Sequence, residues 1–156
     1  MEESELKKKY EALRKKYSLP SYEDIDFEFE ISSIEDGKFL TREIIRKIID
    51  KLDFYQKILE GLLQPDTNSL ASMYECKHFD DKEKNEIYFL FKRLMVVKSE
   101  FSLLDLSPDE KKNSEFIIQT YKFWLDEKKK IAEIISKIKD SWKHETDIKE
   151  DLGYLG

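Results

Sequence analysis

The residues of this chain best suited to chemistry gather at Glu75, Cys76 and His78, which supply a carboxylate, a thiol and an imidazole. Glu75-x-x-His78 has the spacing used by carboxylate-bridged di-iron bundles, but that centre needs a second such motif, and Ser141 stands three residues before His144. A zinc site could recruit Cys76, His78 and His144, although these are few ligands for a closed tetrahedral site. We therefore predict no metal and no cofactor, with Glu75, Cys76 and His78 as the candidate ligands if a metal binds.

Nucleophilic catalysis would have to start from Cys76, because it is the single cysteine of the chain. Its nearest possible base is His78, two residues away, and residues two apart share a face on a strand but not on a helix. A third group that would orient the base is not evident from the sequence. We find no catalytic signature and favour a function that is not enzymatic.

Charge is distributed unevenly over the first 36 residues, although the net charge of the whole chain is −6. The basic residues of the segment 4–17 are Lys7, Lys8, Lys9, Arg14, Lys15 and Lys16. Residues 21–36 are rich in acids and contain no base. A basic segment of this kind can contact nucleic acid, but the acidic net charge weakens any general affinity for phosphate. We favour mutual neutralisation of the two segments and keep nucleic-acid binding through the basic residues as an alternative.

The acidic segment contains an apolar strip whose secondary structure the pattern leaves open. Ile25, Phe27, Phe29 and Ile31 alternate with acids at period two, which is typical of a strand. Ser21 followed by Asp24 resembles a helix start, and Tyr22, Ile25 and Phe29 fit one helical face. We favour a short helix, because the chain shows no second strand to pair with. A strand would have to pair with another molecule, so the four strip residues are candidate partner-binding residues.

Residues 64–79 form a long connection without a clear period. Such connections are uncommon in compact domains and often carry function. Met73, Tyr74 and Phe79 are its candidate partner-binding residues. The alternative interpretation is a short helix, capped by Ser69, that closes one end of a bundle.

Three segments carry apolar residues spaced alternately three and four apart, the repeat that keeps one seam of a helix against its neighbours. The seams comprise Ile45, Ile48, Leu52, Tyr55, Leu59 and Leu62; Ile87, Leu90, Leu94, Val97, Phe101 and Leu104; and Ile117, Tyr121, Trp124, Ile131, Ile135, Ile138 and Trp142. They predict long helices over residues 39–63, 80–104 and 108–142, and a weaker pattern predicts a short helix over residues 4–17. Short connections between long helices favour antiparallel neighbours. We therefore predict an all-α fold, an antiparallel bundle of three long helices with coiled-coil-like packing, plus a short N-terminal helix and small helical or extended segments.

Length and composition fit one small acidic domain. We expect a single helical-bundle domain over residues 1–143 and a flexible acidic tail over residues 144–156. One cysteine excludes an intrachain disulfide, and no apolar run is long enough to cross a membrane. We expect a cytoplasmic protein without membrane contact.

The many apolar and aromatic residues lead to the function we favour, a non-enzymatic protein–protein interaction module that binds another protein or itself. The alternatives are a nucleic-acid-associated factor that uses the basic N-terminal helix and a metal-binding protein that uses Glu75, Cys76 and His78.

Overall fold

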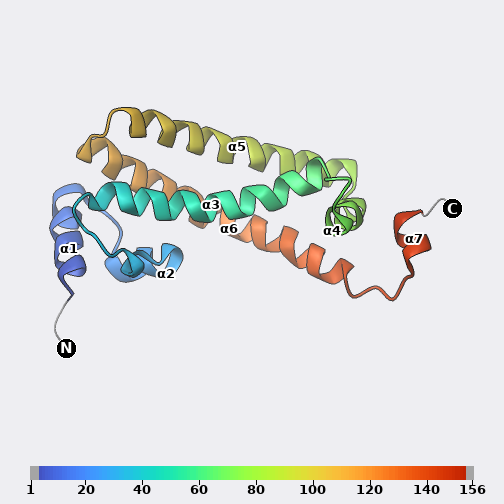
Figure 1. The fold of residues 1–156 in the computed structure, drawn as a ribbon. Helices are drawn as coiled ribbons and strands as arrows, with labels where there is room; N and C mark the ends of the chain where they lie inside the picture. Colours follow the sequence, from blue (N-terminus) through green and yellow to red (C-terminus); the bar gives the residue numbers. More distant parts are fainter. Residues whose placement is uncertain (1–3, 154–156) are drawn as a thin grey trace. The chain divides into compact units, whose positions relative to one another are not determined.

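The computed structural model describes residues 4–153 and confirms the all-α prediction, because these residues form seven α-helices and no strand (Figure 1). The elements are α1 (Glu5–Tyr17), α2 (Tyr22–Phe29), α3 (Leu40–Leu63), α4 (Leu70–Glu75), α5 (Asp81–Leu106), α6 (Glu110–Ser141) and α7 (Ile148–Leu152), with the 3₁₀ helices η1 (Ile31–Ser33) and η2 (Cys76–His78). Residues 1–3 and 154–156 of the predicted domain and tail lie outside the described range.

The chain clusters into two compact units. Unit 1 comprises the residues up to Asp53 together with Met95–Asp126, and unit 2 comprises Phe54–Leu94 together with the residues from Glu127 onward. The three long helices α3, α5 and α6 each run through both units. The single domain over residues 1–143 stays a prediction.

Unit 1 begins with two capped helices that contact each other, α1 and α2 (Figure 1). The side chain of Ser4 accepts the Lys7 N–H at 3.1 Å, and that of Ser21 accepts the Asp24 N–H at 3.1 Å, so each helix starts on a serine cap. The segment 22–29 is therefore helical, as we favoured, rather than a strand. α2 ends at Phe29, because the following residue, Glu30, has a left-handed backbone (φ 54°) that stops the helix.

The core of unit 1 is built from one face of each helix. Its main buried side chains are Tyr10, Ile25, Phe29, Ile31, Ile44, Ile45, Ile48, Leu52, Phe116, Ile117 and Trp124. Side-chain bonds join the three long helices here: Arg42 of α3 pairs with Asp105 of α5 at 2.9 Å, and Asn113 of α6 donates to Thr41 of α3 at 3.3 Å. The predicted packing of three long helices is thus present within this unit.

Unit 2 has its own core, formed by Leu59, Leu62, Tyr74, Phe79, Ile87, Leu90, Leu94, Ile131 and Ile134. Asp80 and Glu83 cap the start of α5 reciprocally, with N–H to carboxylate distances of 2.8 and 3.1 Å. The connection over residues 64–79 contains α4, a short helix capped by Ser69, and a partner-binding role for this connection stays a prediction.

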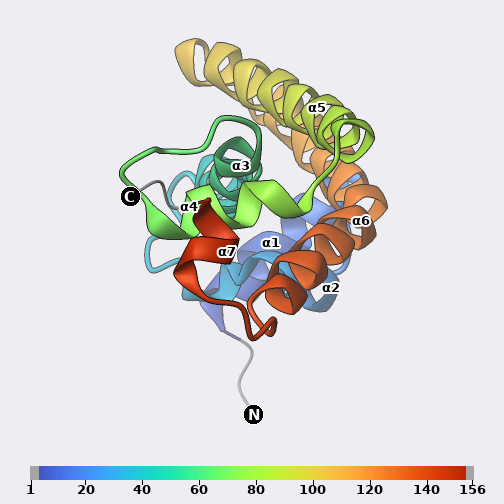
Figure 2. The same ribbon diagram turned by 90° about the vertical axis from the view of Figure 1, so that its right-hand side faces the viewer.

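The segment predicted to be a flexible tail is partly helical. Asp147 caps α7 by accepting the Glu150 N–H at 2.9 Å, and α7 contacts α4 (Figure 2). Lys77 of η2 also donates to the main-chain carbonyl of Asp151. Residues 148–152 of the predicted tail thus form a helix, and the flexibility of the tail over residues 144–156 stays a prediction.

Candidate functional site

The most prominent feature of the surface is a row of apolar side chains along α5. These side chains, which we call the α5 face, are Tyr88, Phe89, Met95, Val96, Leu103 and Leu106. Leu103 is 69% exposed and Leu106 is 80% exposed, which is unusual for leucine in a folded domain. At roughly 100 Å² per side chain, the six present on the order of 600 Å² of apolar surface, at the upper end for a monomeric protein.

The spacing of these residues places them on one side of the helix. Phe89, Val96 and Leu103 are seven apart, which is two helical turns, and at 3.6 residues per turn all six fall within about 120° of the circumference. The buried residues Ile87, Leu90 and Leu94 point in the opposite direction, toward the core. α5 is therefore apolar on two faces, and only one of them is covered.

Charged side chains border the α5 face on one side. Arg93 and Glu100 are seven residues apart and lie next to Phe89 and Val96 on the helix surface, and both are exposed. Arg93 makes a bidentate contact with Glu127 of α6 at 3.0 and 3.1 Å. Lys92 lies within the face, with its ammonium group 5.5 Å from the centre of the Tyr88 ring.

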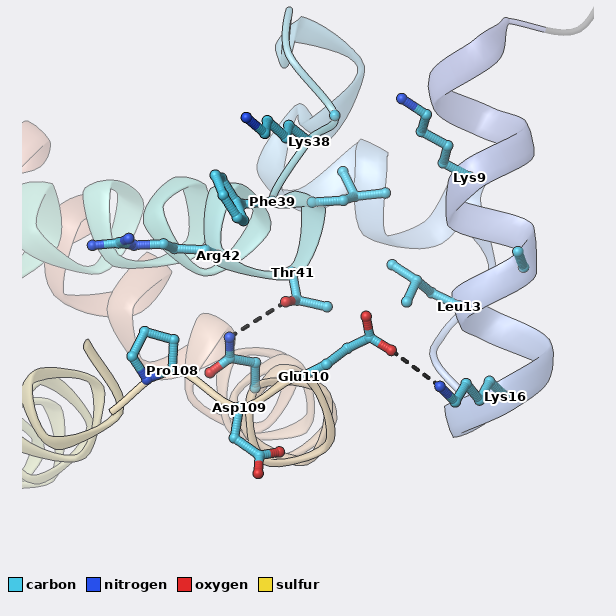
Figure 3. A pocket seen from close by; sticks show the side chains of 14 residues that line it. Lys9, Leu13, Lys16, Lys38, Phe39, Thr41, Arg42, Pro108, Asp109 and Glu110 are labelled. Atoms are coloured by element: carbon cyan, nitrogen blue, oxygen red, sulfur yellow. Dashed lines mark hydrogen bonds and ion pairs between the residues drawn. The ribbon is translucent and has the colours of Figure 1, made fainter. Parts of the chain in front are cut away.

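Unit 1 also contains a cavity of about 640 Å³ between α1 and the first turns of α3 and α6 (Figure 3). Basic side chains surround it, but acids accompany them. Lys9 pairs with Glu5 at 3.4 Å, Lys16 with Glu110 at 3.4 Å, and Arg42 with Asp105 at 2.9 Å.

Glu110 is held in its ionised form at this cavity. The Tyr17 hydroxyl, 2.8 Å from the Glu110 carboxylate, lowers the pKa of that carboxyl, and Lys16 adds to the effect. A ligand anion would therefore meet a carboxylate beside Lys16. The α5 face is accordingly the stronger candidate site of the two.

The strip at residues 25–31 is largely buried. Ile25, Phe29 and Ile31 are buried in unit 1, whereas Phe27 is 78% exposed. On a helix, residues four apart share a face and the residue between them points away, so helix formation buries Ile25 and Phe29 together. The partner-binding role of the four residues stays a prediction, and Phe27 is the one among them that is exposed.

Tyr74 and Phe79 are also buried, so they do not form an exposed binding surface. The Tyr74 hydroxyl donates to the main-chain carbonyl of Ser141, and its ring lies 4.3 Å from that of Trp142. Burial raises the pKa of the Tyr74 hydroxyl. Met73 is half-buried and keeps its predicted role as a proposal.

The candidate metal ligands are only partly brought together. His78 and His144 have ring centres 5.9 Å apart in unit 2. The Cys76 thiol instead contacts the main-chain carbonyl of Met73 at 3.3 Å, and Glu75 accepts the Trp142 indole N–H at 3.0 Å. Within residues 4–153, no group of three or more His, Cys, Asp or Glu side chains is arranged to hold a metal ion.

Several side chains of the basic helix α1 are paired with carboxylates. Lys7 contacts Glu23 of α2 at 2.8 Å, and Arg14 contacts Glu11 at 3.4 Å. Among these pairs only Lys7–Glu23 joins the basic segment to the acidic one, since Lys9 and Arg14 pair within α1 and Lys16 pairs with α6, so mutual neutralisation of the two segments stays a prediction. Lys8 and Lys15 are exposed.

A buried polar cluster in unit 1 was not anticipated from the sequence. Glu28 is only 6% exposed, and its carboxylate accepts the Trp124 indole N–H at 2.6 Å. Lys51 donates to the main-chain carbonyl of Glu28, and its ammonium group lies 5.2 Å from the centre of the Trp124 ring. The partners come from α2, α3 and α6, so no local sequence pattern could have identified them.

The chain was compared with known protein families, with curated proteins and with solved structures, and none of the three comparisons finds a match. No helix within residues 4–153 has both the length and the apolar character needed to cross a membrane.

Proposed function

We propose that this chain is a non-enzymatic protein–protein interaction module and that the α5 face is its binding surface. The observation that supports this function is the exposure of six large apolar side chains on the side of α5 opposite its buried face. Water contact with such a row is unfavourable by about 25 cal/mol per Å². A partner that covers it recovers this free energy.

The form of the α5 face favours a helical partner. Apolar residues at heptad spacing are the pattern with which one helix packs along another. Phe89, Val96 and Leu103 supply three such positions, and Arg93 and Glu100 at the border supply charges that select the partner and its direction.

The test compares three forms of the protein as immobilised bait. The face variant Val96→Glu/Leu103→Glu adds two charges to the α5 face, and the control variant Gln119→Glu/Ser136→Glu adds the same charge at exposed positions of α6. Circular dichroism first establishes that both variants keep the helical content of the wild type.

We expect the wild type and the control to bind a protein that the face variant does not bind. The bound protein is identified, purified and titrated against all three forms, and its Kd for the face variant should be at least about 100-fold higher. Equal binding by the face variant would overturn the proposal, and so would a wild type that binds no other protein and also stays monomeric to roughly 500 µM.

A further inference from the structure

We infer that the partner of the α5 face is a second copy of this chain, bound with the two α5 helices antiparallel. This inference rests on the proposed function and goes further by naming the occupant. It follows from three properties of α5: the heptad spacing of its exposed residues, the charges at their border and the area that the pairing would cover.

The first property is that the α5 face is self-complementary in one antiparallel register. In such a pair the first apolar position of each heptad packs against the fourth position of the other helix. On α5 the first positions are Phe89, Val96 and Leu103, and the fourth positions are Lys92, Ser99 and Leu106. One register therefore places Phe89 on Leu106 of the second copy, Val96 on Ser99 and Leu103 on Lys92.

The two-fold axis repeats each of these contacts, as an isologous interface requires. The small Ser99 accommodates the branched Val96 near the axis. Lys92 lays its aliphatic stem along Leu103 of the second copy and keeps its ammonium group in water.

The second property is that the border charges agree with the same register. An antiparallel pair brings residues on the same flank of the seam together, and this places Arg93 beside Glu100 of the second copy. The symmetry makes this attraction twice. Arg93 keeps nitrogen donors for it while it contacts Glu127 through Nε and Nη2.

A parallel pair of the same helices is disfavoured by the same charges. In parallel register each seam residue faces its own copy, so Lys92 would face Lys92 within the apolar seam. Arg93 and Glu100 would then lie opposite Tyr88 and Met95 and lose their opposite-charge partners. The distribution of charge along α5 therefore selects the antiparallel direction.

The third property is the area of the α5 face, which fixes the expected strength of the dimer. Roughly 600 Å² from each copy gives about 1,200 Å² in total, the lower end of the range for specific interfaces. With a lysine and a serine in the seam, we expect a reversible dimer with a Kd of the order of tens of micromolar.

The test is sedimentation equilibrium of the full chain from roughly 1 to roughly 500 µM, which spans the expected Kd. The two informative variants are Arg93→Glu and Glu100→Arg. In a homodimer of either variant both border pairs become like-charged, and we expect the Kd to rise at least about 10-fold. The Gln119→Glu/Ser136→Glu variant is the control and should dimerise as the wild type does.

The decisive measurement mixes the two variants in equal amounts. In the mixed dimer both border pairs are again of opposite charge, so the mixture should dimerise with nearly the wild-type Kd. This recovery also shows that each variant is folded. Failure of the mixture to dimerise, or unchanged dimerisation of both single variants, would rule out the antiparallel register that places Arg93 beside Glu100 of the second copy.

The same experiments separate this inference from the proposed function. A wild type that stays monomeric to roughly 500 µM overturns the second copy as the partner. If that monomer still binds another protein through the α5 face in the bait experiment, only the identity of the partner has failed. If it binds nothing, the proposed function fails as well.

Discussion

The buried contact between Glu28 and Trp124 leads to a prediction about folding stability. Trp124→Phe removes the indole N–H that donates to the Glu28 carboxylate at 2.6 Å, while both side chains are buried. A hydrogen bond to a charged group contributes about 1.5–3 kcal/mol, and the smaller ring leaves unfilled space that costs roughly 1 kcal/mol more. We expect Trp124→Phe to lower the free energy of unfolding by about 3 kcal/mol.

Glu28→Gln and Trp124→Phe together form a double-mutant cycle. The amide has nearly the same shape and can still accept the indole N–H, so on its own this substitution should cost about 1 kcal/mol. In the Trp124→Phe background the carboxylate is buried with one donor fewer. There the uncharged amide should restore about 1 kcal/mol, because it is less costly to bury.

Urea unfolding followed by far-UV circular dichroism measures all four proteins without depending on tryptophan emission. The matched control is Trp142→Phe, which removes an equivalent bond to Glu75 at an exposed position and should cost about 1 kcal/mol or less. The reasoning would be refuted if Glu28→Gln had the same effect in both backgrounds, within about 0.5 kcal/mol.

Three further substitutions test separate parts of the structure. Burial raises the pKa of Tyr10, whose hydroxyl donates to the Pro20 carbonyl at 2.6 Å. The neutral Tyr10 hydroxyl therefore contributes its full stabilisation below about pH 10, the approximate pKa of tyrosine in the unfolded chain. Above about pH 10 the free energy of unfolding should fall. In Tyr10→Phe the loss of unfolding free energy at alkaline pH should be smaller than in the wild type, as measured by urea unfolding across pH. Gly61→Ala should raise the free energy of unfolding by about 0.5–1 kcal/mol, because Gly61 lies within α3 and the added methyl group meets an atom only at 3.6 Å; a lower melting temperature would contradict this. Leu90→Ala should cost about 2–5 kcal/mol, while Leu103→Ala on the same helix should change stability by no more than about 0.5 kcal/mol. Equal losses for the two leucines would show that the α5 face is covered within the monomer.

Local sequence signals located most helix ends, because each end depends on a few neighbouring atoms. The serine caps at Ser21 and Ser69 are present as predicted. The start of α6 was misplaced by two residues. The cap there is Asp109, which accepts the Lys112 N–H at 3.0 Å, so α6 begins at Glu110 rather than at residue 108.

The three- and four-residue spacing was sufficient to predict the all-α fold, since periodicity alone decides which side of a helix can be buried. It did not reveal which apolar faces remain uncovered. α5 carries a second apolar row at Phe89, Val96 and Leu103, and its meaning depends on how many neighbours the helix has. A search for heptads on both faces of α5 would have found this row.

Tertiary structure decided which of the candidate site residues are buried and which groups they contact. Ile25 and Phe29 are buried in the core, Phe27 is exposed, and the Cys76 thiol contacts the Met73 carbonyl. The sequence determined where helices form, because caps and periodicity act over a few residues. The contacts of Glu28 with Trp124 and of Arg42 with Asp105 join residues more than sixty positions apart, and only the folded chain brings such groups together.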